Sequence, residues 1–275
     1  MPVAQHSVMP DSLHERYELV KERISRAAER AGRRASDVLL VAVTKHAEPE
    51  QVRTLIDLGH ADFGENRVQN LIQQAAMVEE YTTRLRVAPS AKSVGKDGPG
   101  APARDGQVRW HMIGHLQRNK ARKVVEYVRL VHSVDSLRLA EELQAIALRR
   151  DQVIDVLVQV NCSGERSKYG CPVPAALPLA EQIDTMINVR VRGMMTMAPF
   201  SENPEDTRPT FARCRELYEE LRTSGISPGN VNILSMGMTG DFEVAISEGA
   251  NVVRVGTAIF GEPRNPLPDD DTDGD

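Results

Sequence analysis

The stretch DVLLVAVTK, residues 37–45, is a short apolar run rich in valine. Runs of this kind are typical of strands in a parallel sheet, because helices cover both faces of such a sheet and leave no solvent side for polar residues. Helical patterns flank this run. Residues 12–30 carry an apolar stripe among charges, and a second helical segment begins near Pro49 and ends at Gly59. Together these segments predict the start of a β/α fold.

The same alternation continues along the chain. Seven more strand-like runs follow, with helical patterns between them: ADFGEN (61–66), VRWHMIGH (108–115), RLVHSVD (129–135), VIDVLVQVN (153–161), VRVRGMMTM (189–197), NVNILSMG (230–237) and NVVRVGTAIFG (251–261). Eight such runs predict an α/β fold, a single (β/α)8 TIM-type barrel. An open doubly wound sheet is the alternative, because periodicity does not show whether the last strand pairs with the first. No GxGxxG turn follows the first run, which weakens the dinucleotide-binding form of that alternative.

We expect the barrel to span residues 10–261 as one domain, which suits a chain of 275 residues. Residues 88–107, APSAKSVGKDGPGAPARDGQ, are rich in Gly, Pro, Ser and Ala and have no hydrophobic period. This segment is therefore predicted to be a flexible insertion. Residues 262–275 are predicted to form a disordered acidic tail.

The composition narrows the class of protein. Aromatic residues are only 4% of the chain, so aliphatic side chains must build the core. A net charge of −5 argues against a nucleic-acid partner, which needs a basic surface. No apolar stretch approaches the roughly 18–20 residues of a membrane span, and the N-terminus lacks the pattern of a secretory signal. Three cysteines predict no disulfide framework. We therefore predict a cytoplasmic protein.

Polar residues gather where the predicted strands end, and β/α barrels place their active sites at that end. Lys45 closes the first run, and Arg254 lies in the last one. By itself, Lys45 fits either a side chain that reaches water from a strand end or a nucleophilic amine. A nearby cation such as Arg254 and a desolvated setting would lower the pKa of that amine, which could then form an imine with an aldehyde cofactor.

The loops after the last two strands favour a phosphate group. In LSMGMTGDFEVAISEG, residues 234–249, Gly237 lets the backbone approach a ligand, and Thr239 or Asp241 can cap the following helix. Taken alone, this motif fits an ordinary turn equally well. Gly256 and Thr257 follow the last strand, however, and these two loops are the usual phosphate site of the fold.

Two other patterns carry less weight. His111 and His115 would face the same side of a strand, but no third ligand completes a recognised metal spacing, so we predict no metal site. Cys162 has no partnered base in view and is interpreted as a small packed thiol.

Six motifs occur in a fixed order: AVTK (42–45), GENRVQ (64–69), WHMIGHLQRNK (110–120), HSVDS (132–136), SMGMTGDFEVAI (235–246) and VRVGTAIFG (253–261). As a set they closely resemble the YggS/PROSC family, the pyridoxal-phosphate-binding homeostasis proteins. The resemblance runs from about the first helix to Gly261 and leaves out the insertion and the tail. Arg67 stands where a tyrosine is common, Met112 where a phenylalanine is common, and Thr239 where a serine is common.

The resemblance implies a barrel like the N-terminal domain of alanine racemase, without the C-terminal β domain. Lys45 would hold pyridoxal 5′-phosphate (PLP) as a Schiff base, and Arg254 would face the pyridine nitrogen. The residues around the phosphate would be Ser235, Gly237, Thr239, Gly256 and Thr257. Asn66, His111 and Met195 would line the cofactor ring.

The expected chemistry favours a carrier over a catalyst. An arginine keeps its proton, so the pyridine nitrogen stays unprotonated and the ring is a weaker electron sink than it would be beside a carboxylate. Racemases of this barrel type bring a second acid/base group from a further domain, and no such domain is evident here. We therefore predict no catalytic residue and a monomer that acts in vitamin B6 homeostasis, affects amino-acid and keto-acid balance indirectly, and hands PLP to apo-enzymes.

Two alternatives remain. One is a PLP-dependent enzyme of the amino-acid racemase type. The other is a phosphate-sugar enzyme whose Lys45 forms imines with its substrates.

Overall fold

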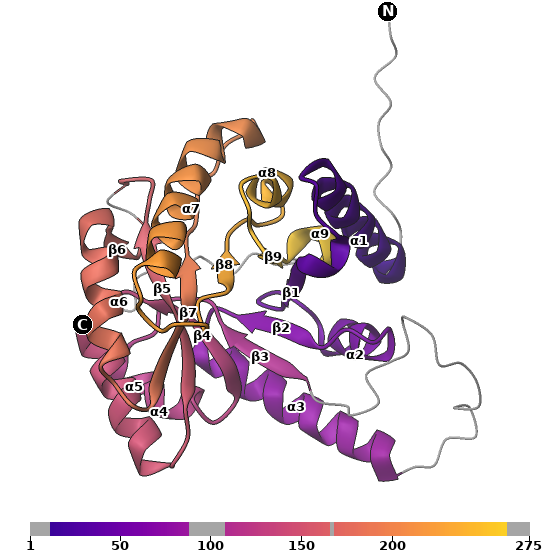
Figure 1. The fold of residues 1–275 in the computed structure, drawn as a ribbon. Coiled ribbons are helices and arrows are strands. Elements are labelled where there is room, and N and C mark those ends of the chain that lie inside the picture. The colour runs from indigo at the N-terminus through magenta and orange to yellow at the C-terminus, as the bar shows by residue number, and fades with distance from the viewer. Residues whose placement is uncertain (1–11, 88–107, 166–167, 263–275) are drawn as a thin grey trace, which may run out of the picture.

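The computed structural model describes residues 12–87, 108–165 and 168–262. Within them, eight parallel strands form a closed barrel (Figure 1). The strands are β1 Leu39–Val43, β2 Asp62–Glu65, β3 Arg109–Met112, β4 Val128–Val134, β5 Ile154–Asn161, β7 Val189–Met195, β8 Ile233–Ser235 and β9 Val252–Val255. A further two-residue strand, β6 Cys171–Pro172, pairs with β5 outside this ring.

The strand pairing closes the barrel. Strand β1 pairs with β2 on one side and with β9 on the other, where Val41 lies opposite Arg254. At the far side of the ring, β4 pairs with β5. Every strand of the ring therefore has two parallel neighbours. The predicted (β/α)8 barrel is confirmed, and the open-sheet alternative is wrong.

Helices surround the barrel (Figure 1). They are α1 Leu13–Arg30, α2 Pro49–Asp57, α3 Val68–Val87, α4 Arg118–Val124, α5 Leu137–Arg149, α6 Ala176–Asp184, α7 Arg208–Thr223, α8 Phe242–Ser247 and α9 Thr257–Phe260, with 3-10 turns at Ala35–Asp37, Val173–Ala175 and Pro204–Thr207. Helix α1 begins with a capping box, in which Ser12 and Glu15 each accept a hydrogen bond from the other's backbone at 3.2 Å. In the described part of the chain, no helix combines the length and the apolar character that a membrane span requires.

The predicted elements differ from the observed ones mainly near their ends. The last predicted strand, residues 251–261, is in fact the short strand β9 followed by helix α9. Apolar residues continue from one into the other, so the sequence pattern does not show the change. The short strand β6 was not predicted. The predicted insertion at residues 88–107 lies outside the described residues, as does the predicted tail beyond Glu262.

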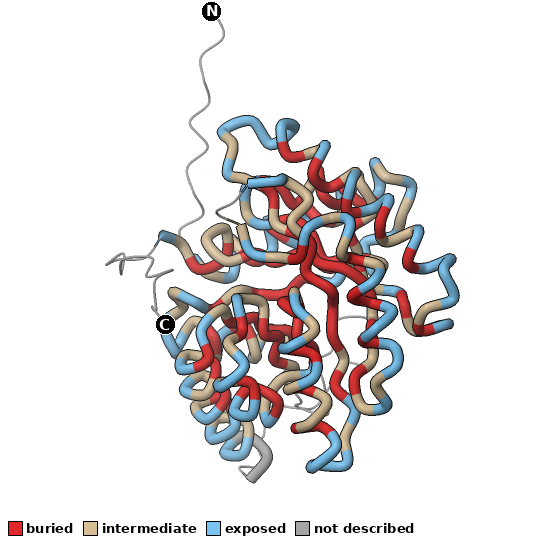
Figure 2. Tube along the Cα trace, turned by 90° about the vertical axis from the view of Figure 1, so that its left-hand side faces the viewer, coloured by how far each residue is buried: buried red, intermediate tan, exposed pale blue. Residues whose placement is uncertain are grey.

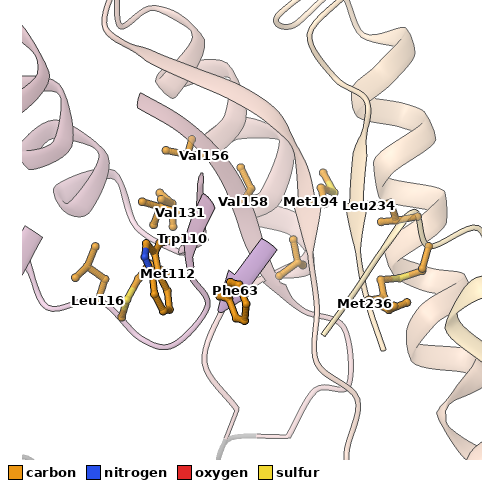
Figure 3. Packing of buried hydrophobic residues seen from close by; sticks show 14 of the residues in the cluster. Phe63, Trp110, Met112, Leu116, Val131, Val156, Val158, Met194, Leu234 and Met236 are labelled. Carbon is orange, nitrogen blue, oxygen red and sulfur yellow. The ribbon is translucent and has the colours of Figure 1, made fainter. Parts of the chain in front are cut away.

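The buried side chains form two layers because side chains alternate across each strand. The larger layer lies between strands and helices, where Figure 3 shows Val131, Val158 and Met194 on adjacent strands. Figure 2 shows this burial concentrated along the strands, while the helices alternate between buried and exposed positions. A small apolar cluster faces the barrel axis and consists of Leu130, Leu157 and Met195, with Met197 and Ile233 packed against it.

Ion pairs occupy the N-terminal ends of the strands. Asp62 pairs with Arg109, whose Nε lies 2.8 Å from Oδ1. Asp155 accepts from Arg190 Nε at 2.6 Å and from Arg192 Nη1 at 2.7 Å. The opposite end of the barrel, where the strands terminate in loops, is the end that the sequence assigns to function.

Candidate functional site

Lys45 lies at the mouth of the barrel, two residues beyond the end of β1. Alternation along β1 places Val41 and Val43 on the side of the barrel axis and Thr44 on the side of the helices. Thr44 is indeed buried and donates its hydroxyl to Glu65. Continued alternation assigns Lys45 to the same side as Val43, and Lys45 is exposed. Its amine is therefore accessible at the open end.

Arg254 lies inside the barrel on the neighbouring strand β9 and is 3% exposed. Its Nη1 donates to Ser235 Oγ at 2.6 Å, and its Nη2 donates to the backbone oxygen of Thr196 at 3.0 Å. Burial lowers the pKa of Arg254 to about 10, against the opposing attraction of the Asp241 carboxylate. The guanidinium thus stays charged at neutral pH, on the wall of the same space that Lys45 enters.

The loops after β8 and β9 bring two predicted hydroxyls together. Thr239 Oγ1 is 3.3 Å from Thr257 Oγ1, and Thr239 Oγ1 also accepts from the backbone N–H of Ala258 at 3.4 Å. Asp241 occupies the N-cap position of α8, but its carboxylate accepts from the N–H of Met238 at 2.6 Å instead of capping the helix. The capping role predicted for Thr239 or Asp241 is therefore wrong, because both side chains bond within or between the loops.

Two glycines allow this close approach of the loops. Gly237 has φ +89°, and a Cβ there would lie 2.7 Å from the Cα of Phe242 and from the Cβ of Ala245. At Gly256, a Cβ would lie 3.2 Å from the backbone oxygen of Val43. Both predicted glycines thus occupy places that a larger residue would fill.

Three other predicted residues lie deeper than expected. The Ser235 hydroxyl is bonded to Arg254 and lies 3.0 Å from His132 Nδ1, so it is engaged inside the barrel and not with Thr239 or Thr257. His111 is 3% exposed and contacts Asp62 and His132. Met195 belongs to the apolar cluster on the axis. These side chains face the axis as alternation requires, but they lie below the mouth.

The end of β2 contributes two buried polar residues. Asn66, a predicted residue, has its Oδ1 buried without a hydrogen-bond partner in the described part of the chain, and the same holds for Oε2 of Glu65. A Cβ on Gly114 would lie 2.2 Å from the Asn66 backbone oxygen, so the loop after β3 packs directly on Asn66. Glu65 was missed. A carboxylate in a strand whose residues are otherwise all apolar-facing or buried is the signal that could have indicated it.

Burial raises the pKa of Glu65 to about 7, while the hydrogen bond from Thr44 opposes the shift. An acid with a raised folded-state pKa destabilises the protein above that pKa, and this cost disappears as the pH falls toward the unfolded value of 4.5. Glu65→Gln keeps an acceptor for Thr44 and removes the charge. We expect it to raise the free energy of unfolding at pH 8.5 by about 3 kcal/mol.

Urea unfolding of the cofactor-free protein between pH 4.5 and 8.5 measures this effect. The gain of Glu65→Gln should shrink as the pH drops from 7 to 4.5. Glu79→Gln, at an exposed position on α3, is the matched control and should leave the pH profile unchanged. A gain independent of pH would show that the charge of Glu65 is not the cause.

The remaining candidates are not assembled into a site. His115 stacks on Tyr169 with ring centroids 4.4 Å apart. The described residues contain no group of three His, Cys, Asp or Glu side chains that could hold a metal ion. Cys162 is a free thiol whose pKa is lowered by a hydrogen bond with Cys214. Met112, where the resemblance noted a departure, packs in the outer layer.

Comparison with known proteins agrees with this geometry. Residues 18–264 match the family described as alanine racemase, N-terminal domain. The pyridoxal phosphate homeostasis protein of Aquifex aeolicus is 39% identical over 250 residues, which cover 90% of this chain and 97% of the relative. The protein of the same name from Escherichia coli K12 is 32% identical over 243 residues, 88% of this chain and 93% of the relative.

Solved structures extend the comparison. PipY of Synechococcus elongatus with PLP bound is 30% identical, with a TM-score of 0.71 over 91% of this chain and 100% of that one. An alanine racemase of Clostridium difficile, 15% identical with a TM-score of 0.62, covers 94% of this chain, which spans 58% of the racemase, and shows the likeness of fold alone. The chain therefore belongs to the alanine racemase N-terminal-domain family and, within it, to the pyridoxal phosphate homeostasis proteins.

Proposed function

We propose that this chain binds PLP through a Schiff base with Lys45 and acts in PLP homeostasis. The observation that carries the proposal is the placement of Lys45 and Arg254 on adjacent strands around one space at the mouth of the barrel, with Val41 opposite Arg254 in the register of β1 and β9. The names of the relatives and the PLP bound to PipY support the same cofactor.

The residues present fit PLP. A phosphate needs hydroxyl and backbone N–H donors in a confined turn, and Thr239, Thr257 and Gly237 supply such a turn. The unpartnered oxygen of Asn66 is available to the ring of the cofactor. Ser235 and His111 would act from behind, through Arg254. When bound, the cofactor supplies an aldehyde for the lysine and an electron-withdrawing ring.

The charge of Arg254 supports a carrier. With a pKa of about 10, this side chain donates hydrogen bonds at neutral pH and keeps its proton. A protonated ring nitrogen is not favoured beside it, and the ring withdraws electrons less strongly. Glu65, the other carboxyl near the mouth, bonds Thr44 on the side of the helices. We therefore propose that efficient catalysis is absent and that the exposed Lys45 releases PLP to apo-enzymes. We also propose that the chain is a monomer, which light scattering measures.

Borohydride reduction of the PLP-loaded protein tests this function. We expect mass spectrometry to find one phosphopyridoxyl group, on the peptide that contains Lys45. Protein reduced without PLP is the control. An adduct confined to other lysines, or no adduct, would contradict the proposal. A reduced adduct formed with sugar phosphates in place of PLP would favour the phosphate-sugar enzyme instead.

A further inference from the structure

A continuous chain of buried hydrogen bonds runs behind Arg254 toward the N-terminal end of the strands. Ser235 Oγ, which accepts from Arg254 Nη1, lies 3.0 Å from His132 Nδ1. His132 Nε2 is 2.9 Å from His111 Nδ1, and His111 Nε2 is 3.2 Å from Asp62 Oδ1. None of the five residues is more than 4% exposed. We name the four residues behind Arg254 the barrel relay: Asp62, His111, His132 and Ser235.

The protons of the relay can be placed from its Asp62 end. Although burial opposes it, the hydrogen bonds from Arg109 and His111 hold the pKa of Asp62 well below its usual range. An ionised carboxylate only accepts hydrogen bonds, so His111 Nε2 carries a proton. The Nδ1 atom of a neutral His111 is then an acceptor.

Only one proton fits between the two imidazoles, because two N–H groups facing each other across 2.9 Å repel. With His111 Nδ1 as the acceptor, His132 Nε2 is the donor. Burial and the neighbouring charges of His111 and Arg254 hold the pKa of His132 well below its usual range, so its Nδ1 carries a lone pair. Ser235 therefore donates its hydroxyl proton to His132 and accepts from Arg254.

We propose that the barrel relay positions Arg254 for the cofactor ring and that Asp62 sets the direction of the relay. Every hydrogen bond in it donates toward Asp62, so no two donors oppose each other. With Thr196 O on Nη2, two of the five N–H groups of the guanidinium are held in place and the others can face a ligand. The inference rests on the proposed function, since it concerns how Arg254 meets PLP.

Two matched variants separate positioning from stability. In Asp62→Asn, the amide can donate to His111 Nε2, which reverses the direction along both rings and aims two donors at Ser235. Asp155→Asn is the control, because Asp155 also pairs with arginines at the N-terminal end of the strands but is not part of the relay. Both substitutions remove one buried carboxylate from an ion pair.

Titration with PLP, followed by absorbance, gives the first readout. We expect Asp62→Asn to bind PLP about tenfold more weakly than Asp155→Asn, the low end of the effect of removing a partner behind a ligand-contacting group. The absorption maximum of bound PLP should move only in Asp62→Asn. A purely structural role would lower the urea midpoint of both variants and leave their affinities and spectra equal, and that result overturns the inference.

Side-chain ¹⁵N NMR of the cofactor-free protein at pH 7.5 gives a readout that does not need PLP. We expect the Nε2–H tautomer for both His111 and His132. A Nδ1–H tautomer or a doubly protonated ring at either position overturns the relay. Failure of wild-type protein to bind PLP, with both tautomers as expected, would instead overturn the proposed function and leave the relay in place.

Discussion

Lys45→Ala is expected to abolish the visible absorption of the PLP-loaded protein and to weaken PLP binding by about a hundredfold or more, which corresponds to about 3 kcal/mol. The side chain is the covalent partner in the proposed function, and its loss leaves only the non-covalent contacts of Arg254 and the phosphate turn. Because Lys45 is exposed, its truncation should change the free energy of unfolding by less than about 0.5 kcal/mol.

Absorbance titration and urea unfolding of the same preparation measure both expectations. Lys45→Arg retains the charge but cannot form the imine, so it should lose the band as Lys45→Ala does. Lys123→Ala, at an exposed position on α4, is the control and should keep the band and the affinity. A Lys45→Ala protein that remains yellow with wild-type affinity would refute the covalent role.

Gly193→Ala should have the largest effect on folding. Gly193 lies in β7 with φ +145°, at a shift in the pairing register with β5. A Cβ there would lie 1.8 Å from the backbone oxygen of Ile233, its pairing partner in β8. The clash involves backbone on both strands, so relief requires breaking the β7–β8 pairing. We expect a loss of about 4 kcal/mol or more, enough to remove most of the stability of a typical domain.

Soluble yield and urea unfolding of the cofactor-free protein check this expectation. The control is Gly225→Ala, because Gly225 also has a positive φ, +84°, but no atom lies within 4 Å of the added Cβ. Gly225→Ala should cost only about 1 kcal/mol, the penalty for the left-handed backbone. Equal midpoints for the two variants would contradict the steric argument.

The order of strands and helices was predictable because it is written in local patterns. Residues 37–45 indicate a strand without any knowledge of their neighbours, since a parallel strand is buried on both faces. The end of β9 was not predictable. Apolar residues run from Val252 through Phe260, and the change into α9 depends on the backbone at Gly256, which packs against Val43.

The site divides in the same way. Thr239 and Thr257 were predicted to lie together because both belong to loops that this fold places side by side, and their hydroxyls are 3.3 Å apart. The depth of Ser235 and His111 was not predictable, because alternation gives the face of a strand and not the level within the barrel. Glu65 was missed for a related reason. Its raised pKa comes from burial under neighbouring segments, which the sequence does not reveal.

The sequence by itself determined the β/α alternation, the lysine at the end of the first strand and the glycine-bearing loops, because each depends on residues close together in the chain. Only the tertiary structure decided that β1 pairs with β9 and β4 with β5, so that the barrel closes. Closure brings Asp62, His132 and Arg254 from three distant strands into one line of hydrogen bonds. Contacts across the barrel depend on strand register and on the level of each side chain, and no local pattern encodes either.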